Sequence, residues 1–238
     1  DVFDEYSFGK KSDQALRALL LEASQNWAGF PQYVILFGDS SYDMRNELGQ
    51  GDRDLIPTRL IDTKIMETSS EAWCVDFDDD GIEDISIGRL PAANVVEALQ
   101  TVEKLARYDA QNEQKRRSSL LVADKGFEGH SNMLEELHPE DVSTVKLNRS
   151  SGTDISLHDR IIEEMNRGPM AVTYTGHGAT GVWASTAVFG LNDADSLSNS
   201  RLSFVMVMSC LNGFVHSPYS DSLGENLFKA ENGAISVW

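Results

Sequence analysis

The sequence has few cysteines and no long apolar run, and each shortage excludes a class of protein. Two cysteines among 238 residues allow at most one disulfide, so the chain is not a disulfide scaffold and its cysteine count does not decide its compartment. No apolar run approaches the roughly 18 residues that a membrane-spanning helix needs. The N-terminal residues also lack the apolar segment of a secretory signal. We therefore expect no membrane span, and we expect any secretory signal to be absent from this chain.

Basic residues are scarce relative to acidic ones. The chain has 20 Lys and Arg against 38 Asp and Glu, which gives a formal net charge of −18. A surface this negative repels phosphate backbones and anionic membranes, so we expect no nucleic-acid partner. The acidic residues are spread along the chain, a pattern that solubility alone also explains. The 41% of hydrophobic residues is enough for a sizeable core.

Two residues capable of chemistry follow two short apolar runs. MAVTYTG leads into His177, and SFVMVMS leads into Cys210. Runs of this length and composition are typical of buried parallel strands. Ligands of an open parallel sheet bind outside the carboxyl ends of its strands. If the two strands are neighbours, an imidazole and a thiol meet at one sheet edge, which is enough for a base and a nucleophile.

The residues around this pair suit acyl transfer. A nearby imidazole activates a thiol, and the N–H groups of Gly178 and Cys210 predict a two-donor oxyanion hole. Taken singly, a strand-end Cys is often a small buried hydrophobe, and a lone His is often a satisfied polar residue. Two competitors stay open: His216 as the base, although it lies in a loop, and Ser40 as a serine nucleophile. No late Asp-x-x-His pair is present to activate Ser40.

These residues resemble the gingipain-type cysteine peptidases, a C25-like family whose caspase-like relatives share a His-Gly strand end and a strand-end Cys. The resemblance rests on YTGHG and S-C-x-N-G, and on DVFDEYSFG, YVILFGDSSYD, DDDGIEDISIGRLPA, LLVAD and GAISVW in the family's order. It implies a caspase-like α/β fold, a three-layer sandwich with mainly parallel sheets and two side-by-side subdomains. It also implies a cysteine endopeptidase acting on protein or peptide substrates, with His177 as base and Cys210 as nucleophile. The family includes enzymes that cut after arginine or lysine.

Alternating strand and helix patterns agree with an α/β fold. In the first half we expect a helix from Ser12 or Asp13 to about Trp27, strands at YVILFG and DISIG, a strand-like AWCV holding an inert Cys74, and a helix over 94–108. In the second half we expect strands at SLLVA, STVKL, MAVTY, SFVMVMS and AISVW, and helices over 131–137, 159–167 and 223–230. The polar NEQKRRSS predicts a boundary near residue 115, between a non-catalytic subdomain (1–115) and a catalytic one (116–238).

The last expected strand, AISVW, has no loop after it. In the family that the chain resembles, the segment after this strand helps to build the pocket for the residue before the scissile bond. We therefore expect the chain to be a fragment or the product of a processing cut. Its partners would then include a C-terminal remainder of the same precursor.

Other residues are candidates for the site. Asp124 ends the LLVA strand at the same sheet edge, and by resemblance it is the acid that orients the catalytic imidazole; the family's acid aligns alternatively with Lys125. Glu128 is a candidate for receiving a basic substrate side chain. Trp183 and Asn212 are candidate walls of the substrate channel. The plainer interpretations are a capped turn for the acids, a lid over the core for Trp183 and a chain turn for Asn212.

The acidic loop over 76–84 predicts a structural calcium site. Its alternating carboxylates and a glycine at the sixth position supply hard oxygen ligands from Asp76, Asp78, Asp80, the carbonyl of Ile82, and Asp84. Ile87 stands where an EF-hand has its bidentate Glu, so the loop is not an EF-hand. Without an ion it is a plain solvated turn. A non-catalytic calcium-binding module of a secreted or surface protein is the alternative function, and we expect a secreted or cell-surface protein in either case.

Overall fold

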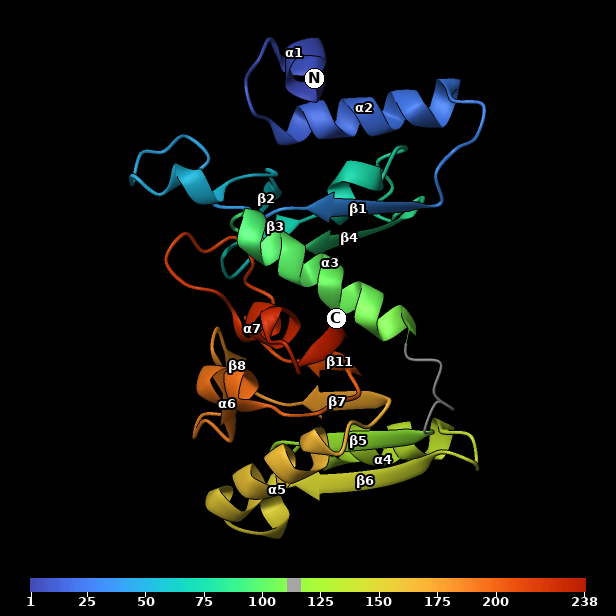
Figure 1. Cartoon of the computed structure of the whole chain (residues 1–238), viewed down its shortest axis with the longest axis vertical. Helices are drawn as coiled ribbons and strands as arrows, with labels where there is room; N and C mark the ends of the chain where they lie inside the picture. Colours follow the sequence, from blue (N-terminus) through green and yellow to red (C-terminus); the bar gives the residue numbers. More distant parts are fainter. Residues whose placement is uncertain (111–116) are drawn as a thin grey trace. The chain divides into compact units, whose positions relative to one another are not determined.

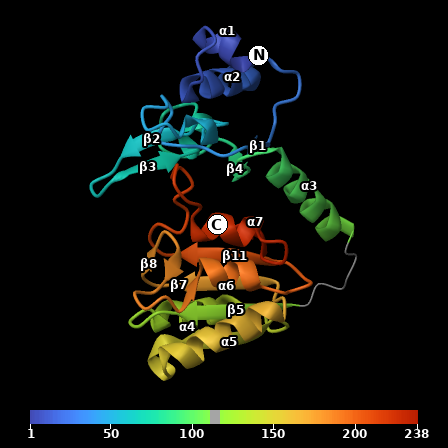
Figure 2. The same ribbon diagram turned by 60° about the vertical axis from the view of Figure 1, so that its left-hand side comes forward.

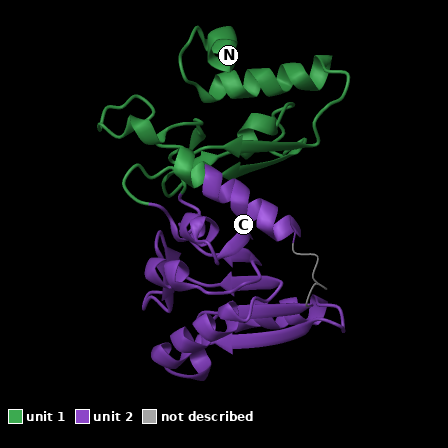
Figure 3. Cartoon of the chain, viewed as in Figure 1, with its two compact units in different colours: residues 1–98, 215–220 green, residues 99–214, 221–238 purple. Residues whose placement is uncertain are grey.

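The computed structural model describes residues 1–110 and 117–238. Its backbone forms two compact units, shown in different colours in Figure 3. The first unit contains residues 1–98 and 215–220, and the second contains residues 99–214 and 221–238. The subdomain boundary expected near residue 115 lies outside the described residues. The division there therefore stays a prediction.

The first unit carries two small sheets and two helices near the N-terminus (Figure 1). A parallel pair joins β1 (Tyr33–Phe37) to β4 (Ser86–Leu90), and β2 (Arg59–Asp62) pairs with β3 (Glu67–Ser70) in an antiparallel hairpin. The other elements are α1 (Val2–Ser7), α2 (Asp13–Asn26), η1 (Gly51–Arg53), η2 (Ala72–Val75) and the start of α3 (Val95–Ala110). The Ser12 side chain accepts from the N–H of Gln14 and caps α2, which confirms the predicted helix start.

The prediction of a strand at AWCV is wrong. These residues form the single 3₁₀ turn η2, in which the Cys74 and Val75 side chains are fully buried. A four-residue apolar run indicates burial, but its length does not distinguish a strand from a helical turn. The expectation that Cys74 is a buried core residue is confirmed.

The second unit is built on a five-stranded sheet in the order β12-β11-β7-β5-β6, and all its strands are parallel. Their bounds are β5 (Ser118–Ala123), β6 (Ser143–Asn148), β7 (Ala171–Thr175), β11 (Ser203–Met208) and β12 (Ala234–Val237). Helices α4 (Glu128–Leu137) and α5 (Asp154–Asn166) connect β5 to β6 and β6 to β7. They lie on opposite faces of the sheet (Figures 1 and 2), because successive right-handed crossovers run in opposite directions along it.

Smaller elements complete this unit. The short strands β8 (Gly178–Ala179), β9 (Val182–Trp183) and β10 (Phe189–Gly190) form an antiparallel sheet after β7. Helices α6 (Leu191–Ser196) and α7 (Leu223–Lys229) and the 3₁₀ turn η3 (Arg149–Ser151) fill the remaining connections. The predicted α/β fold with a mainly parallel sheet is therefore confirmed.

The core of the second unit lies on one face of the five-stranded sheet. The β5, β7 and β11 strands turn alternate residues to this face, and the β5 residues Leu120 and Val122 are adjacent to Val172 and Tyr174 of β7. Helix α5 packs against them through Leu157, Ile161 and Met165. This packing fixes the ends of the strands, where the candidate site lies. No helix among the described residues is long and apolar enough to cross a membrane.

Candidate active site

The predicted base and nucleophile follow two neighbouring strands. β7 and β11 run parallel, and their last paired residues are Thr175 and Met208. His177 and Cys210 each stand two residues beyond that pair, and both are exposed. The N–H of Gly176 donates to the carbonyl of Met208 over 3.2 Å, so the pairing continues past the strand ends. The imidazole and the thiol therefore leave the sheet at the same edge and at the same level.

Gly178 packs directly against the residues that carry the thiol. A Cβ on Gly178 would lie 2.6 Å from the Oγ of Ser209 and 3.0 Å from the carbonyl oxygen of Cys210. Real Cβ atoms essentially never approach other atoms as closely as the first distance. Only a residue without a side chain allows this approach, so the glycine brings the His-Gly turn and the Ser-Cys turn together.

The backbone of His177 is held on both sides. Its carbonyl accepts from the hydroxyl of Tyr174 over 2.5 Å and from the N–H of Ala184 over 2.8 Å. Its N–H donates to the Oδ2 of Asp124 over 3.3 Å. The ring of Phe127 meets the imidazole edge-on, with 5.3 Å between centroids. The base is exposed, yet its position is defined by four neighbours.

Asp124 supports the main chain of His177. Its carboxylate is 2% exposed, and it accepts from the N–H groups of His177 and Lys125 and from the guanidinium of Arg149 over 2.8 Å. Burial raises the pKa of Asp124, but the hydrogen bonds from Arg149 and the two N–H groups outweigh it and hold the pKa below its usual value. Among the described residues, these bonds reach the backbone of His177 and not its ring. The acid therefore acts on the turn that carries the base.

Arg149 supports the candidate site, and the sequence analysis did not identify it. It begins η3 after the β6 strand, and its side chain is largely buried. Its guanidinium also binds both carboxylate oxygens of Asp154, over 2.7 Å and 3.2 Å. A basic residue at the carboxyl end of the strand next to β5 was the available signal. Arg149 neutralises the buried Asp124.

Two candidate walls of the substrate channel lie inside the protein. Trp183 is 0% exposed, stacks on Tyr174 with 4.5 Å between ring centroids and contacts Phe189. Asn212 is 2% exposed, and its side chain bonds to backbone and side-chain groups of its own unit. Side chains without exposed surface cannot line a channel. Their placements match the plainer interpretations, a lid over the core and a turn of the chain.

Glu128 follows Phe127, the residue whose ring meets the imidazole of His177. It is the first residue of α4, directly after Phe127, and its Oε2 accepts from the N–H of Gly126 over 2.9 Å. Its hydrogen bond with Ser150 holds its pKa below the usual value. The carboxylate is therefore negative at neutral pH, and its contact with a substrate stays a prediction.

Neither competing residue is presented to solvent. Ser40 is 1% exposed, and its hydroxyl donates to the carbonyl of Val215 within the first unit. His216 is 2% exposed, and burial lowers its pKa to about 4. Its ring meets Tyr42 edge-on in the same unit. A buried hydroxyl and a buried neutral imidazole are poor candidates for nucleophile and base.

The acidic loop of the first unit gathers three carboxylates. Asp76, Asp78 and Asp84 each offer an oxygen, and these oxygens lie within 4.8 Å of one another. Asp80 is not part of this group; its Oδ1 accepts from the N–H of Ile82 over 2.8 Å. The donor set consists of hard oxygen ligands, which fits Ca²⁺.

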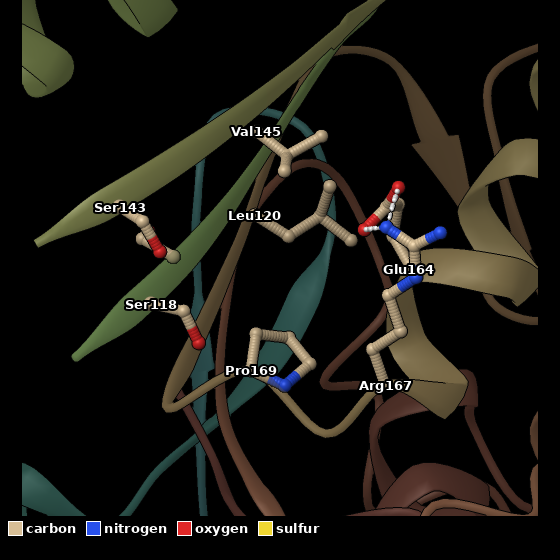
Figure 4. Close-up of a pocket in the computed structure, with 8 residues that line it drawn as sticks. Ser118, Leu120, Ser143, Val145, Glu164, Arg167 and Pro169 are labelled. Atoms are coloured by element: carbon tan, nitrogen blue, oxygen red, sulfur yellow. Dashed lines mark hydrogen bonds and ion pairs between the residues drawn. The ribbon is translucent and has the colours of Figure 1, made fainter. Parts of the chain in front are cut away.

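A cavity of about 150 Å³ lies at the opposite, amino edge of the five-stranded sheet (Figure 4). Ser118 of β5 and Ser143 of β6 line it, and the ion pair between Glu164 and Arg167 closes one side over 2.9 Å. Ser118 and Ser143 begin their strands, whereas His177 and Cys210 follow theirs. The cavity is therefore separate from the candidate active site.

Comparisons with known proteins give the family and the fold of the chain. The sequence model described as Peptidase family C25 matches residues 1–238. The fold is similar to the crystal structure of the Arg specific cysteine proteinase gingipain R, with a TM-score of 0.75 and 21% identity over 95% of this chain and 52% of that chain. It is also similar to the complex of the Porphyromonas gingivalis RgpB pro- and mature domains, with a TM-score of 0.73 and 20% identity over 98% of this chain and 55% of that chain.

A third similar structure is described only as a protease, with a TM-score of 0.75 and 15% identity over 98% of this chain and 51% of that chain. The chain spans about half the length of these structures. A comparison with curated proteins found no match. The structural similarity shows the shared fold, and the family model covers every residue. The chain therefore belongs to peptidase family C25.

Proposed function

We propose that this protein is a cysteine endopeptidase in which Cys210 is the nucleophile and His177 the general base and acid. The observation that carries the proposal is the β7–β11 register, which sets both residues two positions beyond the pair Thr175 and Met208. Their exposure leaves both open to a substrate, and the close approach of Gly178 to Ser209 and Cys210 supports its N–H as a second oxyanion donor beside that of Cys210.

The reaction proceeds through an acyl-enzyme. His177 takes the thiol proton, and the thiolate of Cys210 attacks the scissile carbonyl carbon to form a C–S bond. The N–H groups of Gly178 and Cys210 donate to the oxyanion. His177 then gives its proton to the leaving amine as the C–N bond breaks, and a thioester remains. Water loses a proton to His177, hydrolyses the thioester and restores the free thiol.

Hydrolysis of a peptide mixture, followed by mass spectrometry, tests this mechanism. Cys210→Ala and His177→Ala should each lower the rate by at least about 10²-fold, because each removes a group that takes part in bond making. Ser40→Ala is the matched control and should cleave at the wild-type rate. Loss of cleavage in Ser40→Ala, with retention in Cys210→Ala, would identify a serine hydrolase instead.

We also propose that the enzyme prefers a basic residue before the cut. The net charge of −18 and the negative Glu128 next to Phe127 support this preference. A peptide library varied at that position should favour Arg or Lys in the wild type, and the preference should shrink in Glu128→Gln. Glu136→Gln, on the exposed side of the same helix, should keep the wild-type profile. A wild-type profile without basic preference removes this proposal and leaves the mechanism intact.

We further propose that the loop of Asp76, Asp78 and Asp84 holds a structural Ca²⁺. Three carboxylates this close repel one another, and a divalent cation relieves the repulsion. Calcium at about 100 times its Kd should stabilise the fold by roughly 2.7 kcal/mol over a chelator. Asp78→Asn should reduce that gain, whereas Asp52→Asn, at an exposed position of the same unit, should not. Equal melting temperatures with calcium and with chelator would contradict the proposal that this loop binds calcium.

Weak calcium sites are occupied where calcium is abundant, outside the cell. We therefore propose that the protein is secreted or displayed at the cell surface. Fractionation of the native host tests this placement: the protein should appear in the medium or the surface fraction. Its recovery in the cytoplasm alone would exclude the placement.

A further inference from the structure

We propose that Asn212 is a positioning residue that holds the two oxyanion donors, the N–H groups of Gly178 and Cys210, at a fixed spacing. This inference rests on the proposed peptidase function. Asn212 follows the nucleophile by two residues, and its side chain is 2% exposed. It therefore acts from behind the site and not by touching the substrate.

The amide of Asn212 joins the two turns of the active site. Its Nδ2 donates to the carbonyls of Ala179, over 2.5 Å, and Val182, over 3.3 Å. These two residues face each other in the β8–β9 hairpin, which begins with Gly178. Its Oδ1 accepts from the hydroxyl of Ser209 over 2.9 Å, directly before the nucleophile. One side chain thus links the hairpin that follows the base to the residue that precedes the thiol.

The backbone at this point is strained and needs such support. Leu211, between the nucleophile and Asn212, has a φ of 61°, in the left-handed region that a leucine rarely adopts. Conformations of this kind persist only where the surroundings fix them. The carbonyl of Asn212 also accepts from the N–H of Gly224 over 2.9 Å. Side chain and backbone of Asn212 together fix the strained turn.

The hydrogen bond between the Gly224 N–H and the Asn212 carbonyl depends on the glycine. A Cβ on Gly224 would lie 2.7 Å from the carbonyl oxygen of Asn212, so the first turn of α7 approaches through the absence of a side chain. The Asn212 backbone is thereby tied to a helix, while its amide is tied to the hairpin. The nucleophile turn is held between these two elements.

The chemistry requires a carboxamide at this position. The site offers two carbonyls that need donors and one hydroxyl that needs an acceptor, which only Asn matches at this length. Aspartate would turn an acceptor toward two carbonyl oxygens, and alanine would remove all three bonds that the Asn212 side chain makes. An oxyanion donor must lie about 2.7–3.1 Å from the developing charge. A displacement of about 1 Å is enough to cost roughly 10²-fold in rate.

The test compares Asn212→Asp and Asn212→Ala with the wild type in three measurements. The first is kcat and KM for a peptide substrate. The second is the affinity of a peptide aldehyde, whose adduct with the thiol places an oxygen in the oxyanion hole. The third is the rate at which iodoacetamide alkylates Cys210, a substitution at carbon that forms no oxyanion.

We expect kcat to fall by about 10- to 100-fold with KM nearly unchanged, because the donors serve the transition state. Aldehyde affinity should fall by the same factor as kcat/KM, and the alkylation rate should stay within about twofold of wild type. Ser209→Ala removes only the hydroxyl that donates to Oδ1, so it should show the same pattern at smaller size. It keeps the test open if the Asn212 variants do not fold.

Asn199 provides a matched control. It is also 2% exposed in the same unit, and its amide donates to the carbonyls of Arg201 and Gly233 over 2.8 Å and 3.0 Å. Asn199→Asp should lower the melting temperature but leave kcat and aldehyde affinity unchanged. If it lowers both as much as Asn212→Asp does, the effect is one of general stability and the positioning role is overturned.

Two further outcomes contradict the proposal in different ways. Wild-type kcat in both Asn212 variants, or a fall in kcat without loss of aldehyde affinity, removes the role of Asn212 and leaves the peptidase mechanism standing. A wild-type protein that neither cleaves peptides nor binds the aldehyde removes the proposed function itself, and the role of Asn212 with it.

Discussion

Gly178 is the residue at which the geometry of the site is tightest. The approach of its backbone to Ser209 and Cys210 leaves no room for a methyl group. At the same time, the proposed mechanism uses its N–H as an oxyanion donor. A side chain on Gly178 would therefore push its N–H away from the N–H of Cys210, and the proposed reaction needs both donors close together.

Gly178→Ala should lower kcat by about 10²–10³, the cost of losing one oxyanion donor. The added Cβ would lie 2.6 Å from the Ser209 hydroxyl, so the turn must move away. Gly213→Ala, where no atom lies within 4 Å of the new Cβ, should keep kcat close to wild type. Steady-state kinetics on both variants measures this, and equal kcat in both would mean that the Gly178 donor is not used.

Arg149→Met should destabilise the protein by roughly 3–5 kcal/mol at neutral pH, because it leaves the buried Asp124 carboxylate without its cation. Denaturant unfolding measures the loss. Arg160→Met is the control; this guanidinium is half exposed, so its ion pairs should contribute about 1 kcal/mol or less. A loss no larger than that of the control would show that Asp124 does not depend on Arg149.

The same pair gives a pH dependence with a definite sign. The pKa of Asp124 is lowered on folding, so its contribution is fully present above the unfolded value, near 4, and is lost as pH falls through the folded value. In Arg149→Met the folded pKa rises, because the pairing is gone. The difference in unfolding free energy between wild type and variant should therefore shrink as the pH falls, first through the raised folded pKa of the variant and then through the lowered folded pKa of the wild type. A constant difference would contradict the ion pair as its cause.

At the scale of elements, the periodic segments were predictable and the short ones were not. The SLLVA and MAVTY runs form strands that are buried almost throughout, as expected for a parallel sheet covered on both faces, whereas SFVMVMS forms a strand that buries Val205 and leaves Phe204 and Met208 exposed. The expected neighbour relation of the last two is confirmed by their register. Strands β8, β9 and β10 have two residues each, too few to show any period.

The helices were predictable in their existence but not in their first residue or their burial. The spacing of Val95, Leu99 and Val102 predicts α3, and the helix is present over Val95–Ala110. These side chains are nevertheless half or more exposed. Helix α5 begins earlier than expected because Thr153 caps it, its side chain accepting from the N–H of Ser156. Periodicity therefore indicates that a helix is present. It does not indicate the residue at which the helix begins or the part of the protein that packs against its apolar face.

The burial of Cys74 in the η2 turn predicts how this second thiol reacts. Cys74 is 0% exposed, and burial raises its pKa to about 12. A thiol-counting reagent at pH 8 should therefore find one reactive cysteine in the native protein and two in denaturant. Two fast-reacting thiols in the native state would contradict the buried position. Cys210→Ala separates the two signals, since its native form should then show none.

At the scale of the whole molecule, the net charge of −18 should affect how charged substrates arrive. Attraction between a negative protein and a basic peptide raises the association rate, and salt screens it. We expect kcat/KM for a peptide with Arg before the cut to fall as ionic strength rises, while a neutral peptide of equal length changes little. Identical salt dependence for the two peptides would mean that the global charge has no part in substrate capture.

For the candidate site, the sequence predicted the neighbouring strands that carry His177 and Cys210, but not the residues that support them. His177 and Cys210 follow strand-like runs, so their sheet edge was visible in the sequence. The bonds of Asp124 to Arg149, and of Asn212 to Ala179, join residues far apart along the chain. No local pattern encodes such contacts, because they depend on how neighbouring turns pack. Trp183 was misplaced for the same reason: a glycine-rich loop does not reveal that its aromatic turns inward.

The central claim is that His177 activates Cys210, and thiol labelling tests it most directly. A peptide carrying a thiol-reactive group, applied at about pH 6, should label Cys210 of the wild type at one site per chain. His177→Ala should react at least tenfold more slowly, because no imidazole then takes up the thiol proton and the thiolate is the reactive form. His138→Ala, at a histidine that bonds to Thr144, should react like the wild type. Equal labelling rates in wild type and His177→Ala, or labelling of Cys74 in place of Cys210, would contradict the account.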